Sequence, residues 1–274
     1  MMNFSYKAAA IQLVSGVEPE ANLQEAGKLV AQAARDGARL VVLPENFACM
    51  GRQGDSRGIR ESHGHGPLQG FLSGLAREHG VWLIGGTIPL QAEDVRKERA
   101  ASLVFDDQGN EVCRYDKIHL FDADVEGGER HRESDNIEPG ANPVIWDTPF
   151  GRLGLSVCYD VRFPELFRFR SQGPDIIAVP SAFTAVTGKA HWEVLVRARA
   201  IENVAYVIAA AQGGVHENGR ETHGHSMIVD PWGRILASHE REAGIVVAEI
   251  DPDSLQAARR SIPCLANRRI FCDG

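Results

Sequence analysis

The chain has 274 residues, of which 43% are hydrophobic and 24% are charged, a composition typical of a globular protein with one sizeable core. Its formal net charge of -8 argues against nucleic acid or an anionic membrane as a partner, because both require a basic surface, and favours a small-molecule substrate. No apolar run approaches the ~18 residues of a membrane span and the N-terminus lacks the apolar stretch of a signal peptide, so we expect a cytoplasmic protein.

Strands and helices alternate in the first third of the sequence. Apolar runs predict strands at 7–13, 40–43 and 81–84, and helical spacing predicts helices at 21–36 and 68–79. Gly37 and Gly80 follow these helices and mark their ends. The strand at 40–43 ends in Pro44 and Glu45, which places an acid where a wholly apolar run stops.

A weak internal repeat relates the two halves of the chain with an offset of 124 residues. The residues 103–112 predict a hairpin that consists of a strand, an Asp-x-x-Gly turn and a second strand. The same pattern recurs at 227–236. The strand beginning at Trp82 aligns with one beginning at Tyr206, and each follows an amphipathic helix, the second at 190–204. Two similar αβ halves predict two sheets packed face to face with helices outside. We expect one domain over 1–274, in which 254–274 form a helix and an arm that docks on a second subunit.

The stretch 151–166 contains the strongest candidate for a nucleophile. Alternating apolar residues predict a short buried strand that ends in Cys158, and Pro164 with Glu165 predicts the first turn of a helix. A strand-to-helix turn exposes its residue at the carboxyl end of a sheet, where a thiol can reach a ligand. The alternative is that Cys158 is a buried small hydrophobic residue, since free cysteine is among the most buried types.

Three chemically useful residues each follow a predicted strand: Glu45, Lys117 and Cys158. A thiol nucleophile needs a base, and a reaction at a carbonyl needs positive charge or N–H donors for the oxyanion, so the three supply complementary roles. Each also has a structural alternative, in which the glutamate caps a helix, the lysine is a solvated charge and the cysteine belongs to the core.

The motifs around these residues resemble those of the nitrilase superfamily, the carbon–nitrogen hydrolases. The matching segments are Leu-Pro-Glu at 43–45, Asp-Lys-Ile-His-Leu-Phe at 116–121, Val-Cys-Tyr-Asp-Val-Arg-Phe-Pro-Glu-Leu at 157–166 and Gly-His-Ser-Met-Ile-Val-Asp-Pro-Trp-Gly at 224–233. The resemblance runs from 7 to about 269 and implies an α/β fold, a four-layer α-β-β-α sandwich. It also implies that Glu45 is the general base, Lys117 the stabiliser of the oxyanion and Cys158 the nucleophile.

A second acid is also implied by the resemblance. Glu133 aligns with a glutamate that some family members place beside the lysine, and Glu126 and Glu129 are rivals for this role. The charged loop 126–136 has the alternative of being only a solvated lid.

Within the superfamily, the segments 180–183, 187–193 and 197–202 resemble the branch that contains deaminated-glutathione amidase and ω-amidase. The implied reaction cleaves an amide of a small carboxylated substrate through a cysteine thioester, most simply deaminated glutathione to 2-oxoglutarate and Cys-Gly. The alternatives are 2-oxoglutaramate, an N-carbamoyl amino acid or a nitrile as substrate, or a non-catalytic thiol-bearing binding protein. The predicted substrate-binding residues are Tyr159, Arg162, Ser181, Phe183 and Thr184. Arg162 has an equal alternative, an ion pair with Glu165 or with a neighbouring subunit.

Other patterns do not predict a cofactor or a metal site. The five cysteines form no C-x-x-C pair, and two pairs of histidines two residues apart, 63 with 65 and 223 with 225, lack further ligands nearby in the sequence. No phosphate-binding glycine motif occurs. The arm after residue 254, together with the resemblance, whose family members pair through the helices that follow the nucleophile, predicts a homodimer or larger homo-oligomer. The side chains at 163, 166, 167 and 169 would then be too apolar for solvent.

Overall fold

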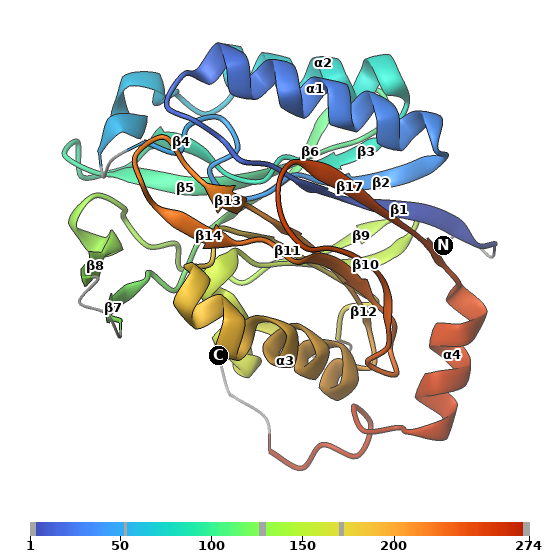
Figure 1. Ribbon diagram of the computed structural model, residues 1–274. Helices are drawn as coiled ribbons and strands as arrows, with labels where there is room; N and C mark the ends of the chain where they lie inside the picture. Colours follow the sequence, from blue (N-terminus) through green and yellow to red (C-terminus); the bar gives the residue numbers. More distant parts are fainter. Residues whose placement is uncertain (1–3, 52–53, 126–129, 170–172, 271–274) are drawn as a thin grey trace.

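The computed structural model describes residues 4–51, 54–125, 130–169 and 173–270. It has four layers (Figure 1). Helices α1 (Pro19–Arg35) and α2 (Pro67–His79) cover the outer face of one sheet, and helix α3 (Ala185–Asn203) covers the outer face of a second sheet. The inner faces of the two sheets pack on each other, so the predicted α-β-β-α sandwich is confirmed.

The first sheet combines the N-terminal half with the last strand of the chain. Its strands are β1 (Tyr6–Gln12), β2 (Ala38–Val42), β3 (Trp82–Ile84), β4 (Ile88–Gln91), β5 (Glu98–Phe105), β6 (Glu111–Asp116) and β17 (Gly244–Ile250). They lie in the order β17-β1-β2-β3-β5-β4, with β6 also paired to β5. Strands β1, β2 and β3 are parallel, and β17 pairs antiparallel along the whole of β1.

The second sheet repeats this connectivity. Its strands are β9 (Ile145–Thr148), β10 (Gly151–Leu155), β11 (Ile176–Ser181), β12 (Tyr206–Ala211), β15 (Ser226–Val229) and β16 (Ile235–His239), in the order β16-β15-β12-β11-β10-β9. Parallel strands β10, β11 and β12 are followed by the antiparallel β15 and β16, just as β1, β2 and β3 are followed by β5 and β6. The predicted duplication of two αβ halves is therefore confirmed.

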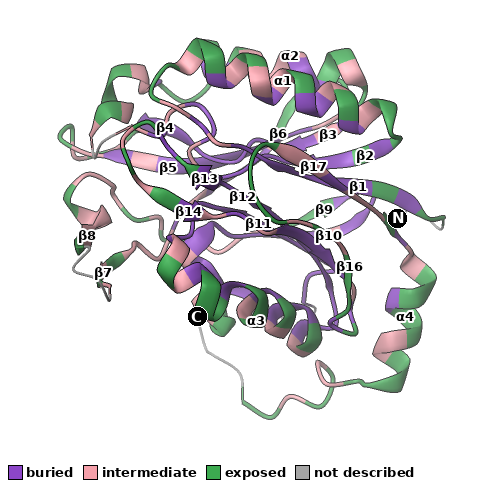
Figure 2. Ribbon diagram, in the orientation of Figure 1, coloured by how far each residue is buried: buried purple, intermediate pink, exposed green. Residues whose placement is uncertain are grey.

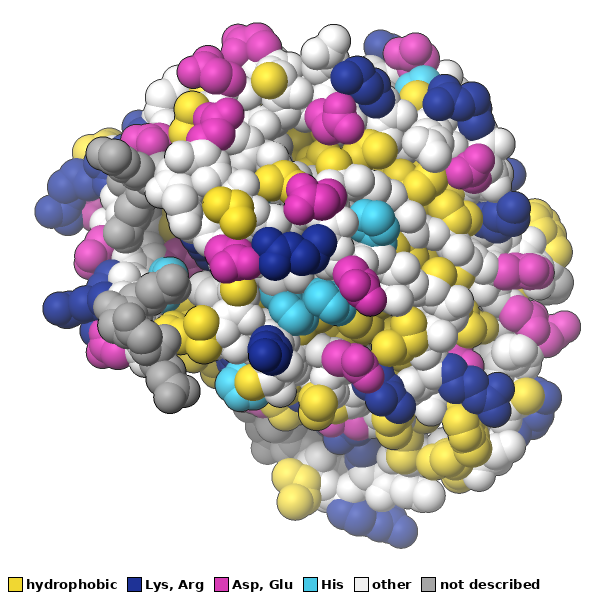
Figure 3. Space-filling model, in the orientation of Figure 1, with side chains coloured by type: hydrophobic (Ala, Val, Ile, Leu, Met, Phe, Trp, Pro, Cys, Tyr) yellow, Lys and Arg dark blue, Asp and Glu magenta, His cyan; other side chains and the backbone are white. Residues whose placement is uncertain are grey.

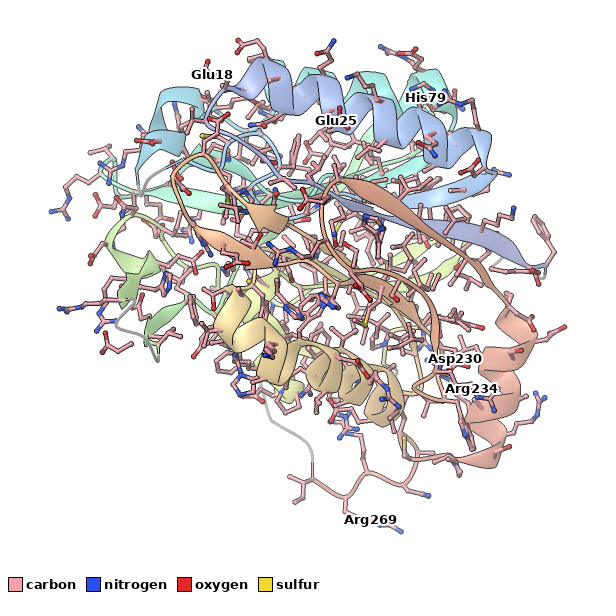
Figure 4. All side chains as sticks on the ribbon, in the orientation of Figure 1. Glu18, Glu25, His79, Asp230, Arg234 and Arg269 are labelled. Atoms are coloured by element: carbon pink, nitrogen blue, oxygen red, sulfur yellow. The ribbon has the colours of Figure 1, made fainter. Side chains whose placement is uncertain are left out.

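The two hairpin turns are alike in detail. In the first turn, Asp106 Oδ1 accepts hydrogen bonds from the N–H groups two and four residues later, at 2.9 and 2.8 Å. In the second, Asp230 Oδ1 accepts from Trp232 and Arg234 N–H at 2.8 Å each, and Figure 4 labels Asp230 and Arg234 in this turn. Side-chain acceptors at the first position of a turn are the physical reason that the Asp-x-x-Gly pattern marked both hairpins.

Successive side chains of a strand point to opposite faces of its sheet, and the buried residues accordingly form two clusters. On β1, Ala8 and Ala10 face the second sheet, and Ala9 and Ile11 face the helices α1 and α2. Figure 2 shows the resulting continuous buried layer between the sheets. No helix in the described segments is long and apolar enough to cross a membrane. Acidic and basic side chains are interspersed over the face seen in Figure 3.

The segment after Cys158 contains the helical turn predicted at Pro164 and one more. The turn at Pro164 is the short 3-10 helix η4 (Pro164–Phe167), and a second 3-10 helix, η3 (Cys158–Arg162), precedes it. Leu166 and Phe167 are buried within their own chain, 6% and 1% exposed, so their apolar character does not require a second subunit.

The C-terminal segment forms helix α4 (Pro252–Ser261) and then runs along its own chain. Arg259 of α4 donates to the Asp175 carboxylate, which also accepts from the backbone N–H and the guanidinium of Arg152. Beyond the helix, Arg268 donates to the Arg168 carbonyl at 2.7 Å. These contacts are intramolecular, whereas the sequence suggested docking on a partner. That residues 1–274 form one domain stays a prediction.

Candidate active site

The three residues predicted from strand ends meet in space. Lys117 Nζ donates to Glu45 Oε1 at 2.8 Å, and the charges of Glu45 and Lys117 both act on the buried Cys158 thiol. Glu45 follows β2 and Lys117 follows β6, both in the first sheet, whereas Cys158 follows β10 in the second. The site therefore lies where the ends of the two sheets come together.

The backbone at Cys158 is in the left-handed region, with φ 50°, which a non-glycine residue adopts only when its surroundings hold it there. Asp160 supplies that constraint from a fully buried position. Its Oδ2 accepts from Val157 N–H at 2.8 Å and Tyr115 O–H at 2.7 Å, and its Oδ1 accepts from His119 N–H at 3.0 Å and contacts His119 Nδ1 at 2.7 Å. One carboxylate thus fixes both the cysteine turn and the loop after β6.

The charges around the thiol keep it protonated at rest. Burial raises the pKa of Cys158 well above its ordinary value, and the neighbouring Glu45 carboxylate raises it further. Burial alone would lower the pKa of Lys117, but Glu133 and Glu45 together raise it well above its ordinary value, so the lysine is an ammonium. The arrangement is a thiol beside a carboxylate base and a fixed cation.

Glu133 lies on the other side of the lysine. Lys117 Nζ donates to both of its carboxylate oxygens, at 2.7 and 2.8 Å, and Phe121 N–H donates to Oε2 at 2.6 Å. Burial raises the pKa of Glu133, and the charge of Lys117 opposes this shift. Glu133 begins the short helix η2 (Glu133–Asp135), and its two rivals, Glu126 and Glu129, lie outside the described residues.

Two cavities adjoin at this cluster. The smaller, about 60 Å³, contains Glu45, Lys117, Glu133 and Cys158 in its wall, and we call it the catalytic pocket. The larger, about 390 Å³, we call the vestibule. The two share the wall residues Asn46, Phe121, Glu133 and Arg220, so a ligand can extend from one into the other.

Four of the five predicted substrate-binding residues line the catalytic pocket: Tyr159, Arg162, Phe183 and Thr184. Thr184 also caps helix α3, with its hydroxyl accepting from the Thr187 N–H. Ser181 does not line either cavity. It is fully buried as the last residue of β11, and its hydroxyl donates to the Val179 carbonyl at 3.4 Å.

The guanidinium of Arg162 lies between two aromatic rings, 5.6 Å from the centre of Tyr159 and 5.4 Å from that of Phe183. One terminal nitrogen is 3.3 Å from His191 Nδ1, and the buried Nε has no hydrogen-bond partner among the described residues. Within the same residues Arg162 makes no ion pair with Glu165. Arg162 therefore lines the catalytic pocket with one of its N–H donors unused among the described residues.

A second arginine was missed by the sequence prediction. Arg220 lines both cavities and donates to the Ala182 carbonyl at 2.9 Å, while its buried Nε has no partner in the described part of the chain. It lies in the loop between β13 (Gly213–Val215) and β14 (Glu221–His223), and the only signal was one charge in a glycine-rich segment.

The histidine pairs do not form metal sites within the described residues, where no group of three histidine, cysteine or acidic side chains comes together. His63 contacts Glu111 at 2.7 Å, and His223 and His225 stack with ring centres 4.1 Å apart.

Comparison with known proteins agrees with this geometry. The carbon-nitrogen hydrolase family matches residues 7–260. A Synechocystis sp. protein named deaminated glutathione amidase is 45% identical over 268 residues, 96% of this chain and 98% of that protein. A Mus musculus protein of the same name is 41% identical over 95% of this chain and 82% of its own length. The crystal structure of Saccharomyces cerevisiae Nit3, described as a member of branch 10 of the nitrilase superfamily, has a TM-score of 0.87 at 32% identity and covers 97% of each chain. The chain therefore belongs to the carbon-nitrogen hydrolase family and is an enzyme of the nitrilase superfamily.

Proposed function

We propose that the protein is an amidase that cleaves deaminated glutathione to 2-oxoglutarate and Cys-Gly through a cysteine thioester. The observation that carries this proposal is the meeting in one pocket of the Cys158 thiol, the buried Glu45 carboxylate and the Lys117 ammonium, which binds that carboxylate. The names of the relatives in Synechocystis sp. and Mus musculus support the choice of substrate.

In the proposed mechanism, Glu45 takes the thiol proton as Cys158 Sγ attacks the amide carbonyl carbon. Lys117 and the N–H of Tyr159 stabilise the oxyanion of the tetrahedral intermediate. The carbon–nitrogen bond then breaks, and the amine leaves with the proton held by Glu45. Water attacks the thioester as Glu45 accepts its proton, and collapse releases the carboxylic acid and restores the thiol. Glu133 holds the lysine in place.

The free donors of the two arginines favour an anionic substrate. Arg162 in the catalytic pocket and Arg220 at its border each have a buried Nε–H without a partner in the described residues, and a carboxylate is the ordinary ligand for such a donor. The narrow catalytic pocket suits the 2-oxoglutaryl side of the substrate. 2-Oxoglutaramate, the ω-amidase substrate, carries the same acyl group and is the main alternative.

Two measurements test the proposal. Cys158→Ala should lower kcat by several orders of magnitude without loss of folding, whereas Cys113→Ala, a buried cysteine on β6, should leave kcat within about threefold. Turnover by Cys158→Ala close to the wild-type rate would reject the thioester and favour a binding protein.

The second measurement compares substrates. We expect kcat/KM for deaminated glutathione to exceed that for 2-oxoglutaramate by more than tenfold, because only the larger compound contacts the enzyme beyond the scissile bond. A preference for 2-oxoglutaramate would indicate an ω-amidase. A preference for an N-carbamoyl amino acid or a nitrile would reject the substrate class but keep the catalytic residues.

We also propose a cytoplasmic homodimer. Val186, Val194 and Ile201 are 47%, 69% and 49% exposed and follow one another at spacings of eight and seven residues, so they form one apolar stripe along the outer face of α3. A second copy is the partner that would cover this stripe. Light scattering should give the mass of a dimer or larger oligomer, and Val194→Glu should shift it toward the monomer. A fully active wild-type monomer would contradict the proposal.

A further inference from the structure

The vestibule contains one acidic side chain whose bonding is incomplete. Glu98 is the first residue of β5, lines the vestibule and is 3% exposed. Its Oε1 accepts a hydrogen bond from the Ser56 hydroxyl, but its buried Oε2 has no partner among the described residues. A buried carboxylate oxygen without a donor is costly, so such an atom points to a ligand that supplies one.

The position of Glu98 is fixed by its backbone. Its N–H donates to the Asn136 carbonyl at 2.9 Å, and its carbonyl accepts from Glu138 N–H at 2.8 Å. The side chain therefore cannot move to another partner by a shift of the strand. Burial raises the pKa of Glu98, consistent with a carboxylate that lacks donors, although Ser56 and nearby arginines oppose the shift.

Glu98 is connected through β5 to the backbone of the catalytic lysine. Ala100, which also lines the vestibule, lies two residues further along β5 on the same face, about 7 Å away. The Ala100 carbonyl accepts from the backbone N–H of Lys117 at 3.0 Å, so this end of β5 leads to the catalytic lysine.

The division of space assigns the vestibule to the amine side of the substrate. The catalytic pocket, about 60 Å³, holds the nucleophile, whereas the adjoining vestibule is about 390 Å³, so most of a large ligand has to lie in the vestibule. The amine released from a primary amide is ammonia, which is too small to extend from the reacting carbon to Glu98. A leaving group of dipeptide size is long enough and carries a peptide N–H.

We propose that the vestibule is the subsite for the amine side of the amide, and that Glu98 Oε2 accepts the peptide N–H of a departing dipeptide, thereby selecting dipeptide amides over primary amides. This inference rests on the proposed function, because Cys-Gly supplies the N–H. An acceptor oxygen suits an N–H donor and would repel the terminal carboxylate, which can instead be bound by the arginine donors around the cavity.

The test removes the proposed hydrogen bond from both sides, by replacing the peptide N–H in the substrate and the Glu98 carboxylate in the protein. One substrate is 2-oxoglutaryl-Cys-Gly, the second is its ester analogue in which an oxygen replaces the Cys-Gly peptide N–H, and the third is 2-oxoglutaramate. Release of 2-oxoglutarate is measured for the wild type, Glu98→Leu and Glu98→Gln. In the wild type the ester should lower kcat/KM by about tenfold or more, as loss of a hydrogen bond to a charged group does.

In Glu98→Leu, kcat/KM for 2-oxoglutaryl-Cys-Gly should fall by a similar factor. The ratio of kcat/KM between this peptide and its ester analogue should shrink below threefold, and 2-oxoglutaramate should be turned over at the wild-type rate. Glu98→Gln keeps the shape and one acceptor oxygen, so it should give an intermediate difference between peptide and ester. This variant keeps the test decisive if Glu98→Leu does not fold.

Two results would overturn the proposal in different ways. An equal loss for all three substrates in both variants, with the peptide and ester still differing as in the wild type, would make Glu98 purely structural while leaving the proposed function intact. Failure of the wild type to release 2-oxoglutarate from any of the three compounds would reject the proposed function and, with it, the dipeptide as the ligand of Glu98.

Discussion

Replacing Asp160 with asparagine should damage both stability and catalysis. Each carboxylate oxygen contacts two groups, Oδ2 those of Val157 and Tyr115 and Oδ1 two of His119, at 2.7 to 3.0 Å. Asparagine turns one oxygen into an NH2 group, so up to two buried groups lose their acceptor. At about 1–3 kcal/mol for each donor left without an acceptor, the loss of two would lower the free energy of unfolding by about 2–6 kcal/mol.

Catalysis should fall as well, because the same carboxylate holds the turn of Cys158 and the loop that carries Lys117. A displacement of about 1 Å in such a cluster can cost about a hundredfold in kcat. Urea unfolding followed by circular dichroism measures the first effect, and steady-state kinetics measures the second. Asp147→Asn, on an exposed position of β9, is the control and should change stability by less than about 0.5 kcal/mol. An Asp160→Asn protein as stable as this control, with wild-type kcat, would refute the reasoning.

Three further predictions concern stability and titration. Burial alone would raise the pKa of Asp175, but its two arginine partners hold it below its ordinary value of 3.8, so the stability it contributes is present at neutral pH and is lost as the pH falls below about 4. Asp175→Asn should therefore be less stable than the wild type in urea at pH 7, and the gap should narrow as the pH is lowered toward 3; a gap of the same size at both would contradict this. Burial lowers the pKa of His223 to about 4, so an NMR titration should show one histidine resonance with a midpoint there that is absent in His223→Gln, whereas a midpoint near 6.5 would be contrary. Gly86→Ala should destabilise the fold by more than about 1 kcal/mol in thermal unfolding, because Gly86 has φ 57° and a Cβ would lie 2.1 Å from the Pro44 carbonyl oxygen. The control Gly74→Ala in α2 places its Cβ in open space and should be neutral or stabilising. Equal effects of the two changes would count against the argument.

The positions of the proposed catalytic groups were predictable because each follows a strand. Glu45, Lys117 and Cys158 follow β2, β6 and β10, and residues that follow strand ends are the ones placed to reach a ligand. The turn pattern around Asp106 and Asp230 likewise revealed the duplicated hairpins, because the aspartate accepts the same two backbone bonds in each.

Features that depend on long-range contacts were not predictable. The 3-10 helices after Cys158 follow from the bonds that Asp160 makes to another part of the chain. Arg220 reaches the site from a loop without periodicity, and Ser181 differs from its pocket-lining neighbours only because β11 extends as far as that residue. Phe167 was expected at a subunit interface, but it is buried within its own chain.

The division of the active site between two sheets gives the enzyme a built-in requirement for assembly. Glu45 and Lys117 belong to the first half of the chain and Cys158 to the second, so in the proposed mechanism neither half alone contains the complete set of catalytic groups. By that mechanism the thiol is activated only when the inner faces of the two sheets are docked, and we therefore expect hydrolytic activity to report the contact between the halves.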